Sequence, residues 1–301
     1  MTDPMQIAKL NERFGIEKLV RIDAGRGGLP RVVIHTPVAQ AEIYLHGAHV
    51  THYQPHGQQP VLFVSSGAIF EAGNHIRGGV PICFPWFGQR EGQPDAPMHG
   101  FVRSRSWELI AVEQKGQEIH ARLRFVSDDD TRAQWPHDFE AVYEVAVGAT
   151  LSMELAITNR SDDAFTFEEA LHSYLTVSDV RQVAITGLAG ATYIDKEDNF
   201  REKTLGDEPI YYTGAFDRVV VNSTATCELH DPGLERTIRV AKQNSNTTVL
   251  WNPGEKGKPF ADLPDAERIK FVCIETANAR VNAVRLEAGQ THQMRAEISV
   301  V

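Results

Sequence analysis

The sequence is poor in cysteine and contains no long hydrophobic run. Its three cysteines, Cys83, Cys227 and Cys273, are widely spaced and form no CxxC pair. This pattern supports neither a disulfide scaffold nor a zinc knuckle, so we expect buried free thiols in a reducing compartment. No stretch approaches the roughly 18 apolar residues of a membrane helix, and the N-terminal segment lacks the apolar core of a signal peptide. A soluble cytoplasmic protein is therefore expected.

An excess of positive charge is also missing. Lysine and arginine number 30 against 40 aspartates and glutamates, which gives a formal net charge of −10. Acidic residues occur throughout the chain, which argues against nucleic acid or an anionic membrane as the main partner. Any anion that binds must therefore meet a local cationic pocket. The sequence leaves the oligomeric state open, and a monomer is favoured.

Helical periodicity is scarce, whereas alternation of apolar and polar residues recurs from residue 31 to the end. The only helix candidates are Pro4 to Arg13 and a short turn at Leu263 to Arg268. Many strands without covering helices must pack sheet on sheet. We therefore predict an all-β fold, a large antiparallel β-sandwich with few short helices, as a single domain over residues 1–301. The predicted strands include 31–35, 42–50, 118–125, 141–147, 151–157, 247–251 and 294–300, and the predicted turns are 113–116, 147–149, 159–163 and 230–233.

Three local patterns suggest sites that the sequence does not support well. His46, His49 and His52 invite a metal hypothesis, but on one strand His46 and His52 would lie about 20 Å apart and His49 would face the other way. We predict no metal site there. The glycine-rich residues 25–28 lack the lysine and helix of a phosphate loop, so we predict an ordinary turn there. Residues 65–67 lack the glycines of a nucleophile elbow, so they do not indicate a serine hydrolase.

Four short segments carry more chemistry. Arg77 is followed by two glycines, at positions 78 and 79, and by two prolines, at positions 81 and 85, which favour a rigid wall. His99 and Arg103 occupy alternate positions and would share a face of an extended segment. His172 interrupts an apolar, strand-like run. Glu275 terminates an apolar strand, where a carboxylate is costly unless it is partnered or useful. Each of these residues, taken alone, could equally have a structural role, as a hydrogen-bonded core histidine, a structural arginine or a surface acid at the end of a strand.

Motifs in sequence order give these segments a context. They are Gly47-Ala48-His49-Val50, residues 65–70, Arg77-Gly78-Gly79-Val80-Pro81, Pro85-Trp86-Phe87-Gly88, His99-Gly100-Phe101 with Arg103 and Trp107, Trp135-Pro136-His137-Asp138-Phe139, Leu171-His172-Ser173-Tyr174, Tyr193-Ile194-Asp195-Lys196, Phe216-Asp217-Arg218-Val219, and Val249-Leu250-Trp251-Asn252-Pro253 followed by Glu275. This combination resembles the aldose 1-epimerase (mutarotase) superfamily, and more narrowly its glucose-6-phosphate 1-epimerase branch. The resemblance covers nearly the whole chain and also implies a large antiparallel β-sandwich.

The resemblance assigns roles to individual residues. It implies that His172 is the catalytic histidine and Glu275 the catalytic carboxylate. Some relatives carry glutamine where this chain has Met98, and a thioether cannot replace the hydrogen bonds of an amide. The implied contacts to the sugar or its phosphate are Arg77, His99, Arg103 and Asp217.

The implied reaction exchanges the α and β anomers of a hexose 6-phosphate, with D-glucose 6-phosphate the expected substrate. A base must take the proton of the C1 hydroxyl while an acid protonates the ring oxygen. At ordinary pKa values of about 6.5 and 4.3, His172 can serve as the acid and Glu275 as the base. Arg77 and Arg103 favour a phosphate monoester, because guanidinium groups match its geometry and charge. This isomerase chemistry requires no metal and no organic cofactor.

Two other functions remain open at this point. The chain could be a non-catalytic carbohydrate-binding or sugar-sensing protein of the same fold, or a mutarotase for neutral aldoses. Trp86 and Phe87 could offer a sugar a flat apolar face, or could pack in the core instead.

Overall fold

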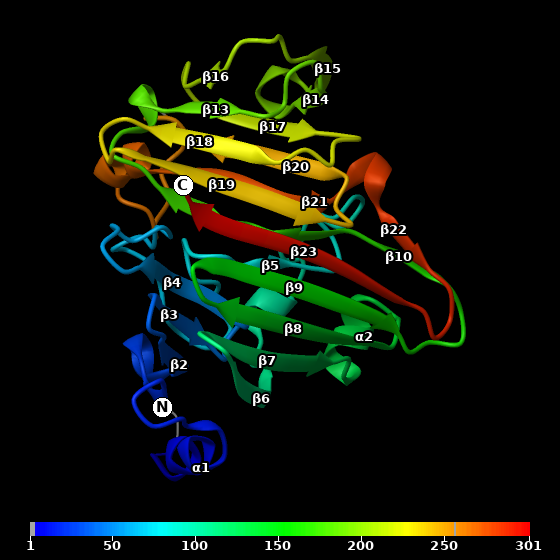
Figure 1. Cartoon of the computed structure of the whole chain (residues 1–301). Helices are drawn as coiled ribbons and strands as arrows, with labels where there is room; N and C mark the ends of the chain where they lie inside the picture. The colour runs from blue at the N-terminus through cyan, green and yellow to red at the C-terminus, as the bar shows by residue number, and fades with distance from the viewer. Residues whose placement is uncertain (1–3, 256) are drawn as a thin grey trace.

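The computed structural model describes residues 4–255 and 257–301, which form an antiparallel β structure with few helices (Figure 1). The predicted all-β fold is thus confirmed. Helix α1 (Pro4–Phe14) agrees with the first expected helix, and a 3-10 helix, η5 (Asp265–Lys270), overlaps the second. The sequence analysis missed α2 (Asp129–Gln134), which begins with a capping box between Asp128 and Thr131.

Two large sheets contain most of the described strands. The nine-stranded sheet has the order β16 (Ile210–Tyr211), β13 (Ala184–Thr186), β18 (Cys227–Asp231), β19 (Arg236–Gln243), β23 (Thr291–Val300), β9 (Thr150–Asn159), β8 (Phe139–Val147), β7 (Glu118–Val126) and β6 (Glu108–Lys115). The eight-stranded sheet has the order β15 (Arg201–Thr204), β14 (Thr192–Asp195), β17 (Phe216–Val220), β20 (Thr247–Asn252), β21 (Phe271–Asn278), β11 (Glu169–Leu171) and β5 (Ile82–Cys83), with β12 (Tyr174–Thr176) also paired to β21.

Two smaller sheets complete the described strands. One contains β1 (Val20–Ala24), β2 (Pro30–His35), β3 (Ala39–Tyr44) and β4 (His49–Pro55), and the other contains β10 (Phe165–Phe167) and β22 (Val284–Leu286). The predicted turns at 113–116, 147–149 and 230–233 lie at the β6–β7, β8–β9 and β18–β19 hairpins. Residues 159–163 instead lead from β9 to β10, which pairs with β22.

The large sheets pack against each other through a shared apolar core, as the overlap of β19 with β20 and β21 in Figure 1 illustrates. Ile238 of β19 belongs to the same buried cluster as Leu250 of β20 and Ile274 of β21. Because side chains alternate along a strand, the neighbours of Ile274 on β21 point to the other face of the eight-stranded sheet. That second face carries Glu275. The expectation of one domain over residues 1–301 stays a prediction.

One expected strand, residues 42–50, is wrong, because the chain turns within it. Strand β3 ends at Tyr44 and β4 begins at His49, with Gly47 and Ala48 at positive φ between them. A Cβ atom on Gly47 would lie 2.5 Å from the backbone oxygen of Arg103, so only glycine allows this close approach. The turn therefore packs directly against the segment that carries Arg103.

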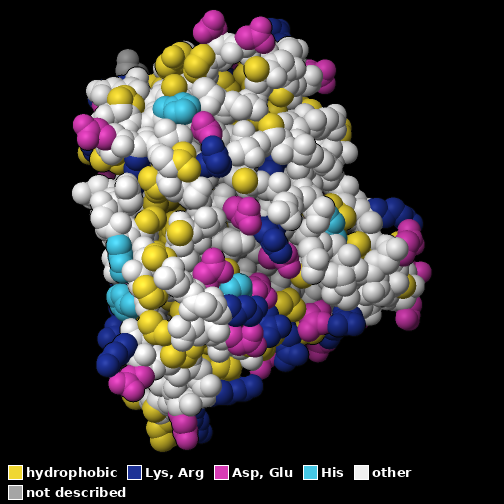
Figure 2. Space-filling model, viewed as in Figure 1, with side chains coloured by type: hydrophobic (Ala, Val, Ile, Leu, Met, Phe, Trp, Pro, Cys, Tyr) yellow, Lys and Arg dark blue, Asp and Glu magenta, His cyan; other side chains and the backbone are white. Residues whose placement is uncertain are grey.

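The outer face of the nine-stranded sheet carries charges of both signs, interspersed over its strands (Figure 2). Arg124 pairs with Glu108 at 2.7 Å, and Arg295 pairs with Glu154 at 2.6 Å. Such cross-strand pairs lie on the solvent side of strands whose alternate residues fill the core. This face is therefore a solvated surface.

The wall predicted around Arg77 depends on the backbone of Gly78, which has a φ of 109°. A Cβ atom there would lie 2.4 Å from the backbone oxygen of Phe63 and 2.5 Å from Cα of Val64. We expect Gly78→Ala to lower the free energy of unfolding by about 3 kcal/mol, because backbone strain and overpacking add. Urea denaturation measures the change. Gly73→Ala is the matched control, since Gly73 also has a positive φ but has no neighbour near a new Cβ atom. Equal losses for the two variants would contradict the packing argument.

Candidate active site

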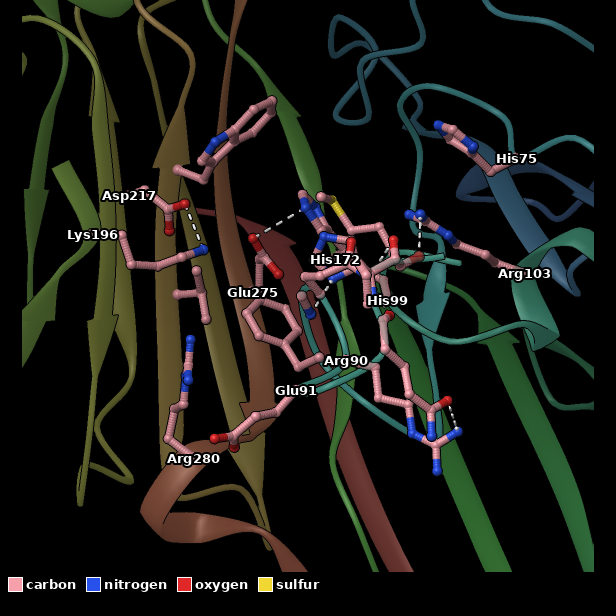
Figure 3. A pocket seen from close by; sticks show the side chains of 18 of the residues that line it. His75, Arg90, Glu91, His99, Arg103, His172, Lys196, Asp217, Glu275 and Arg280 are labelled. Carbon is pink, nitrogen blue, oxygen red and sulfur yellow. Dashed lines mark hydrogen bonds and ion pairs between the residues drawn. The ribbon is translucent and has the colours of Figure 1, made fainter. Parts of the chain in front are cut away.

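A cavity of about 840 Å³ opens on the face of the eight-stranded sheet that carries Glu275 (Figure 3). All six residues singled out from the sequence line it. They are Arg77, His99, Arg103, His172, Asp217 and Glu275. The structure therefore brings together side chains that are scattered over the sequence.

The pairing of β11 and β12 with β21 brings His172 beside Glu275. Leu171 pairs with Thr276, and Tyr174 pairs with Cys273. The two residues between these pairs, His172 and Ser173, therefore lie opposite Glu275 and Ile274. Glu275 lies within β21 rather than at its end, so the expectation of a strand-terminal carboxylate is wrong. The apolar run around His172 forms two short strands, with His172 and Ser173 between β11 and β12.

His172 Nε2 lies 3.3 Å from Glu275 Oε1, and both side chains are buried. Burial lowers the pKa of His172 well below its ordinary value, and the charges of Arg103 and Arg77 lower it further. Burial likewise raises the pKa of Glu275 well above its ordinary value, with Asp217 as a second cause. The expectation of ordinary pKa values is therefore wrong. Both shifts favour the neutral pair, with the proton on the carboxyl group rather than on the imidazole.

His99 is a neutral imidazole whose tautomer is determined by the loop before it. The Gly88 N–H donates to His99 Nδ1 at 3.1 Å, so the ring proton is on Nε2. Burial, followed by the charge of Arg103, lowers the pKa of His99 well below its usual value. The Phe87 ring packs against His99 with centroids 4.8 Å apart. His99 therefore offers a fixed N–H donor at the cavity.

The carboxylate of Glu168 joins two segments of the cavity rim, a role that the sequence analysis missed. It accepts hydrogen bonds from the backbone N–H of Phe87 at 2.9 Å and from that of Arg280 at 2.6 Å. Both of these residues line the cavity. Arg280 has a φ of 59°, and its hydrogen bond to Glu168 helps to hold this left-handed conformation.

Arg77 is held by side chains on two sides. Its Nε donates to Asp262 Oδ2 at 3.1 Å, and its Nη1 donates to the Tyr174 hydroxyl at 3.3 Å. The Tyr174 ring stacks on the imidazole of His172, with centroids 4.8 Å apart and planes 14° apart. Burial and the nearby arginines lower the pKa of His75, a further residue lining the cavity, to about 4. The side chain of Tyr174 thus lies between Arg77 and His172 and contacts both.

Arg103 reaches the cavity by a route that the sequence analysis did not foresee. The segment is not extended, because His99 and Gly100 have positive φ values and Arg103 lies in the 3-10 helix η2 (Val102–Ser104). Phe101 points into the core instead. Arg103 Nη2 donates to the Met98 carbonyl oxygen at 2.6 Å, so Met98 contributes a backbone contact that does not depend on its side chain.

Asp217 forms an ion pair with Lys196, whose Nζ lies 2.6 Å from Asp217 Oδ2. Figure 3 shows this pair on one side of His172 and Glu275, with Arg103 on the other side. The sequence analysis quoted Lys196 within a motif but did not predict it as a site residue. Its surroundings gave no signal, because a lysine followed by Glu197 and Asp198 looks like a solvated turn.

The two aromatic residues of the wall have different environments. Trp86 belongs to the core, and its indole N–H donates to the Pro97 carbonyl oxygen at 2.9 Å. Phe87 lines the cavity, as does Trp251 from β20. Phe87 and Trp251 therefore provide the apolar surfaces that a sugar ring can contact.

The histidine run at residues 46–52 has structural contacts. His46 Nε2 lies 2.6 Å from the Asn74 carbonyl oxygen, and His49 Nε2 lies 2.7 Å from that of Gly78. Within residues 4–255 and 257–301, no three His, Cys, Asp or Glu side chains gather as a metal site. Across the same residues, no helix is both long and apolar enough to cross a membrane.

Comparisons with known proteins agree with this architecture. The profile of the aldose 1-epimerase family matches residues 30–299. A Salmonella typhimurium protein named "Putative glucose-6-phosphate 1-epimerase" is 36% identical over 252 residues, which cover 83% of this chain and 84% of that protein. A crystal structure of a Salmonella typhimurium protein titled as a mutarotase matches with a TM-score of 0.86 and 32% identity, covering 96% of this chain and 95% of the other.

A more distant structure shows how widely the fold extends. A galactose mutarotase related enzyme from Lactobacillus acidophilus matches with a TM-score of 0.72 at 15% identity, covering 90% of this chain and 97% of that one. The antiparallel sandwich with a cavity on one sheet thus defines a mutarotase-like protein. More narrowly, the chain belongs to the aldose 1-epimerase family.

Proposed function

We propose that this protein interconverts the α and β anomers of a hexose 6-phosphate, with D-glucose 6-phosphate as the substrate. The observation that carries the proposal is the 3.3 Å approach of His172 to Glu275 in a cavity that also contains Arg77 and Arg103. The relative from Salmonella typhimurium is named for this substrate. Family membership supports the reaction, and the two guanidinium groups support the phosphate.

In the proposed mechanism, Glu275 accepts the proton of the C1 hydroxyl while His172 donates a proton to the ring oxygen. The ring opens to an aldehyde, the C1–C2 bond rotates, and the two residues exchange roles during closure. Their present contact leaves both groups facing one position, where a sugar can insert between them. The N–H donor of His99 and the polar groups of Asp217 and Lys196 bind and orient the hydroxyls. The steps require no metal and no organic cofactor.

The arrangement of charges suggests how the sugar lies. Arg77 affects the pKa of His172 and Asp217 affects that of Glu275, whereas Arg103 and Lys196 affect both. In Figure 3, Arg103 lies on one side of the pair, and Asp217 and Lys196 lie on the other. In a hexose 6-phosphate, the phosphate is attached next to C5, which carries the ring oxygen that His172 would protonate. Phosphate at the arginines therefore fits a C1 hydroxyl at Glu275.

The same proposal covers location and assembly. We propose that the protein acts in the cytoplasm as a monomer, and a single chain supplies all six proposed site residues. A mutarotase for neutral aldoses would leave Arg77 and Arg103 without a substrate anion. A sugar-binding protein without activity would have no use for the proton exchange between His172 and Glu275.

The test is exchange NMR of the anomeric protons of several hexose phosphates, with and without protein. We expect α and β signals of glucose 6-phosphate to exchange far faster with protein, while glucose exchanges much more slowly at equal concentration. Tight binding of the sugar phosphate without acceleration would identify a sugar-sensing protein instead. Faster exchange of glucose than of glucose 6-phosphate would contradict the assigned substrate.

A further inference from the structure

Positive charge lies near His172, the side chain that must carry an extra proton before the ring opens. Arg77 donates to the Tyr174 hydroxyl, and the Tyr174 ring stacks on His172. Arg103 lies in the same cavity and donates a hydrogen bond to a neutral carbonyl oxygen, that of Met98. Both guanidinium groups therefore disfavour an imidazolium at His172. The charges of Arg77 and Arg103 thus act against the protonated imidazole that the reaction needs as its acid.

The surroundings of Glu275 raise its pKa and so disfavour the carboxylate that must act as the base. Asp217 raises the pKa of Glu275, which burial has already raised, and Lys196 and Arg103 act in the opposite direction. At their separation of 3.3 Å, the two groups therefore favour the neutral form, a protonated carboxyl group beside a neutral imidazole. In this form the acid has no extra proton to donate and the base carries no charge. The ionisable groups that act on the pair are Arg77, Arg103, His99, Tyr174, Lys196, Asp217, Cys83 and Cys273.

We propose that the substrate phosphate activates this pair, in addition to anchoring the sugar. A phosphate dianion bound between Arg77 and Arg103 offsets their charges. The proton on Glu275 Oε1 then moves across the 3.3 Å contact to His172 Nε2, before the sugar ring inserts between the two groups. The step breaks one O–H bond and forms one N–H bond, and no proton is exchanged with solvent. It produces the imidazolium and the carboxylate that ring opening requires. This inference rests on the proposed function of the same site.

The proposal can be tested by supplying the substrate in two pieces. Neutral glucose lacks the dianion, and inorganic phosphate or phosphite supplies it separately. We expect either anion to increase the protein-catalysed anomerisation of glucose about tenfold or more, since one unit in the pKa of the acid corresponds to a factor of ten in proton occupancy. Exchange NMR gives the rate, after subtraction of the rate with the anion alone. Sodium chloride at equal ionic strength is the control for salt.

Variants separate activation from simple binding. Arg103→Met should lose the stimulation. Arg285→Met should keep it, because Arg285 is the exposed residue of β22 and pairs with Glu287 at 3.1 Å. Stimulation of equal size in Arg103→Met would overturn the proposal. So would phosphate that competes with glucose 6-phosphate yet leaves the glucose rate unchanged, and in that case the proposed function would stand. Failure to accelerate glucose 6-phosphate itself would overturn the proposed function.

Discussion

Replacing Glu275 by glutamine should abolish most of the activity while making the protein more stable. Because the amide cannot accept the proton of the C1 hydroxyl, we expect kcat for glucose 6-phosphate to fall by about 10²–10⁴-fold, the usual contribution of a general base. The fold should tolerate the change, since glutamine has nearly the same shape as glutamate. Steady-state or exchange kinetics measure the activity, and circular dichroism verifies the fold.

The gain in stability follows from the raised pKa of Glu275 in the folded protein. Near pH 4.5 and above, the unfolded chain ionises this group more readily than the folded protein does. The contribution of Glu275 to stability is therefore complete at low pH and is lost as pH rises through the folded-state pKa. Glutamine has no such dependence. We expect urea denaturation at pH 8 to show a larger free energy of unfolding for Glu275→Gln than for the wild type.

His172→Asn is the companion variant and should also lower kcat by about 10²–10⁴-fold. If the two residues act as one unit, the double variant should be little worse than the poorer single variant. Losses that multiply would instead indicate independent roles. Wild-type kcat in either single variant would refute the assignment of the pair.

Replacing Arg103 by methionine should change the choice of substrate more than the activity in general. Hydrogen bonds to charged groups contribute about 1.5–3 kcal/mol, so losing this guanidinium should lower kcat/KM for glucose 6-phosphate by about 10–100-fold. Glucose has no phosphate to lose contact with, so its kcat/KM should change much less. The ratio of the two values measures the effect.

Arg103 is the more suitable of the two arginines for this test. Replacing Arg77 would also leave Asp262 without its ion pair, so that a loss of stability would accompany any loss of binding. Arg103 donates its hydrogen bond to the Met98 carbonyl oxygen, and methionine retains most of the apolar stem. Arg285→Met removes the same charge at an exposed position of β22 and should leave both values unchanged. An equal loss for both sugars in Arg103→Met would contradict a phosphate contact.

The class of fold could be predicted from local patterns. Alternating residues and hairpin turns depend on neighbours in the chain, so β7, β8 and β9 were placed to within a few residues. The split between β3 and β4 was missed, because the positive φ values at Gly47 and Ala48 arise where the turn packs against residues around Arg103. Helix α2 was missed for another reason, since its capping box carries a local signal that was overlooked.

The sequence by itself determined the sandwich architecture, the family resemblance and six of the residues that line the cavity. Only the tertiary structure decided that His172 lies opposite Glu275, because this contact results from the register of β11 and β12 on β21. It also decided the direction in which the two pKa values shift, since pKa values respond to burial and to charges such as Lys196 that come from distant segments. Patterns along a chain report neighbours in sequence, whereas electrostatics depends on neighbours in space.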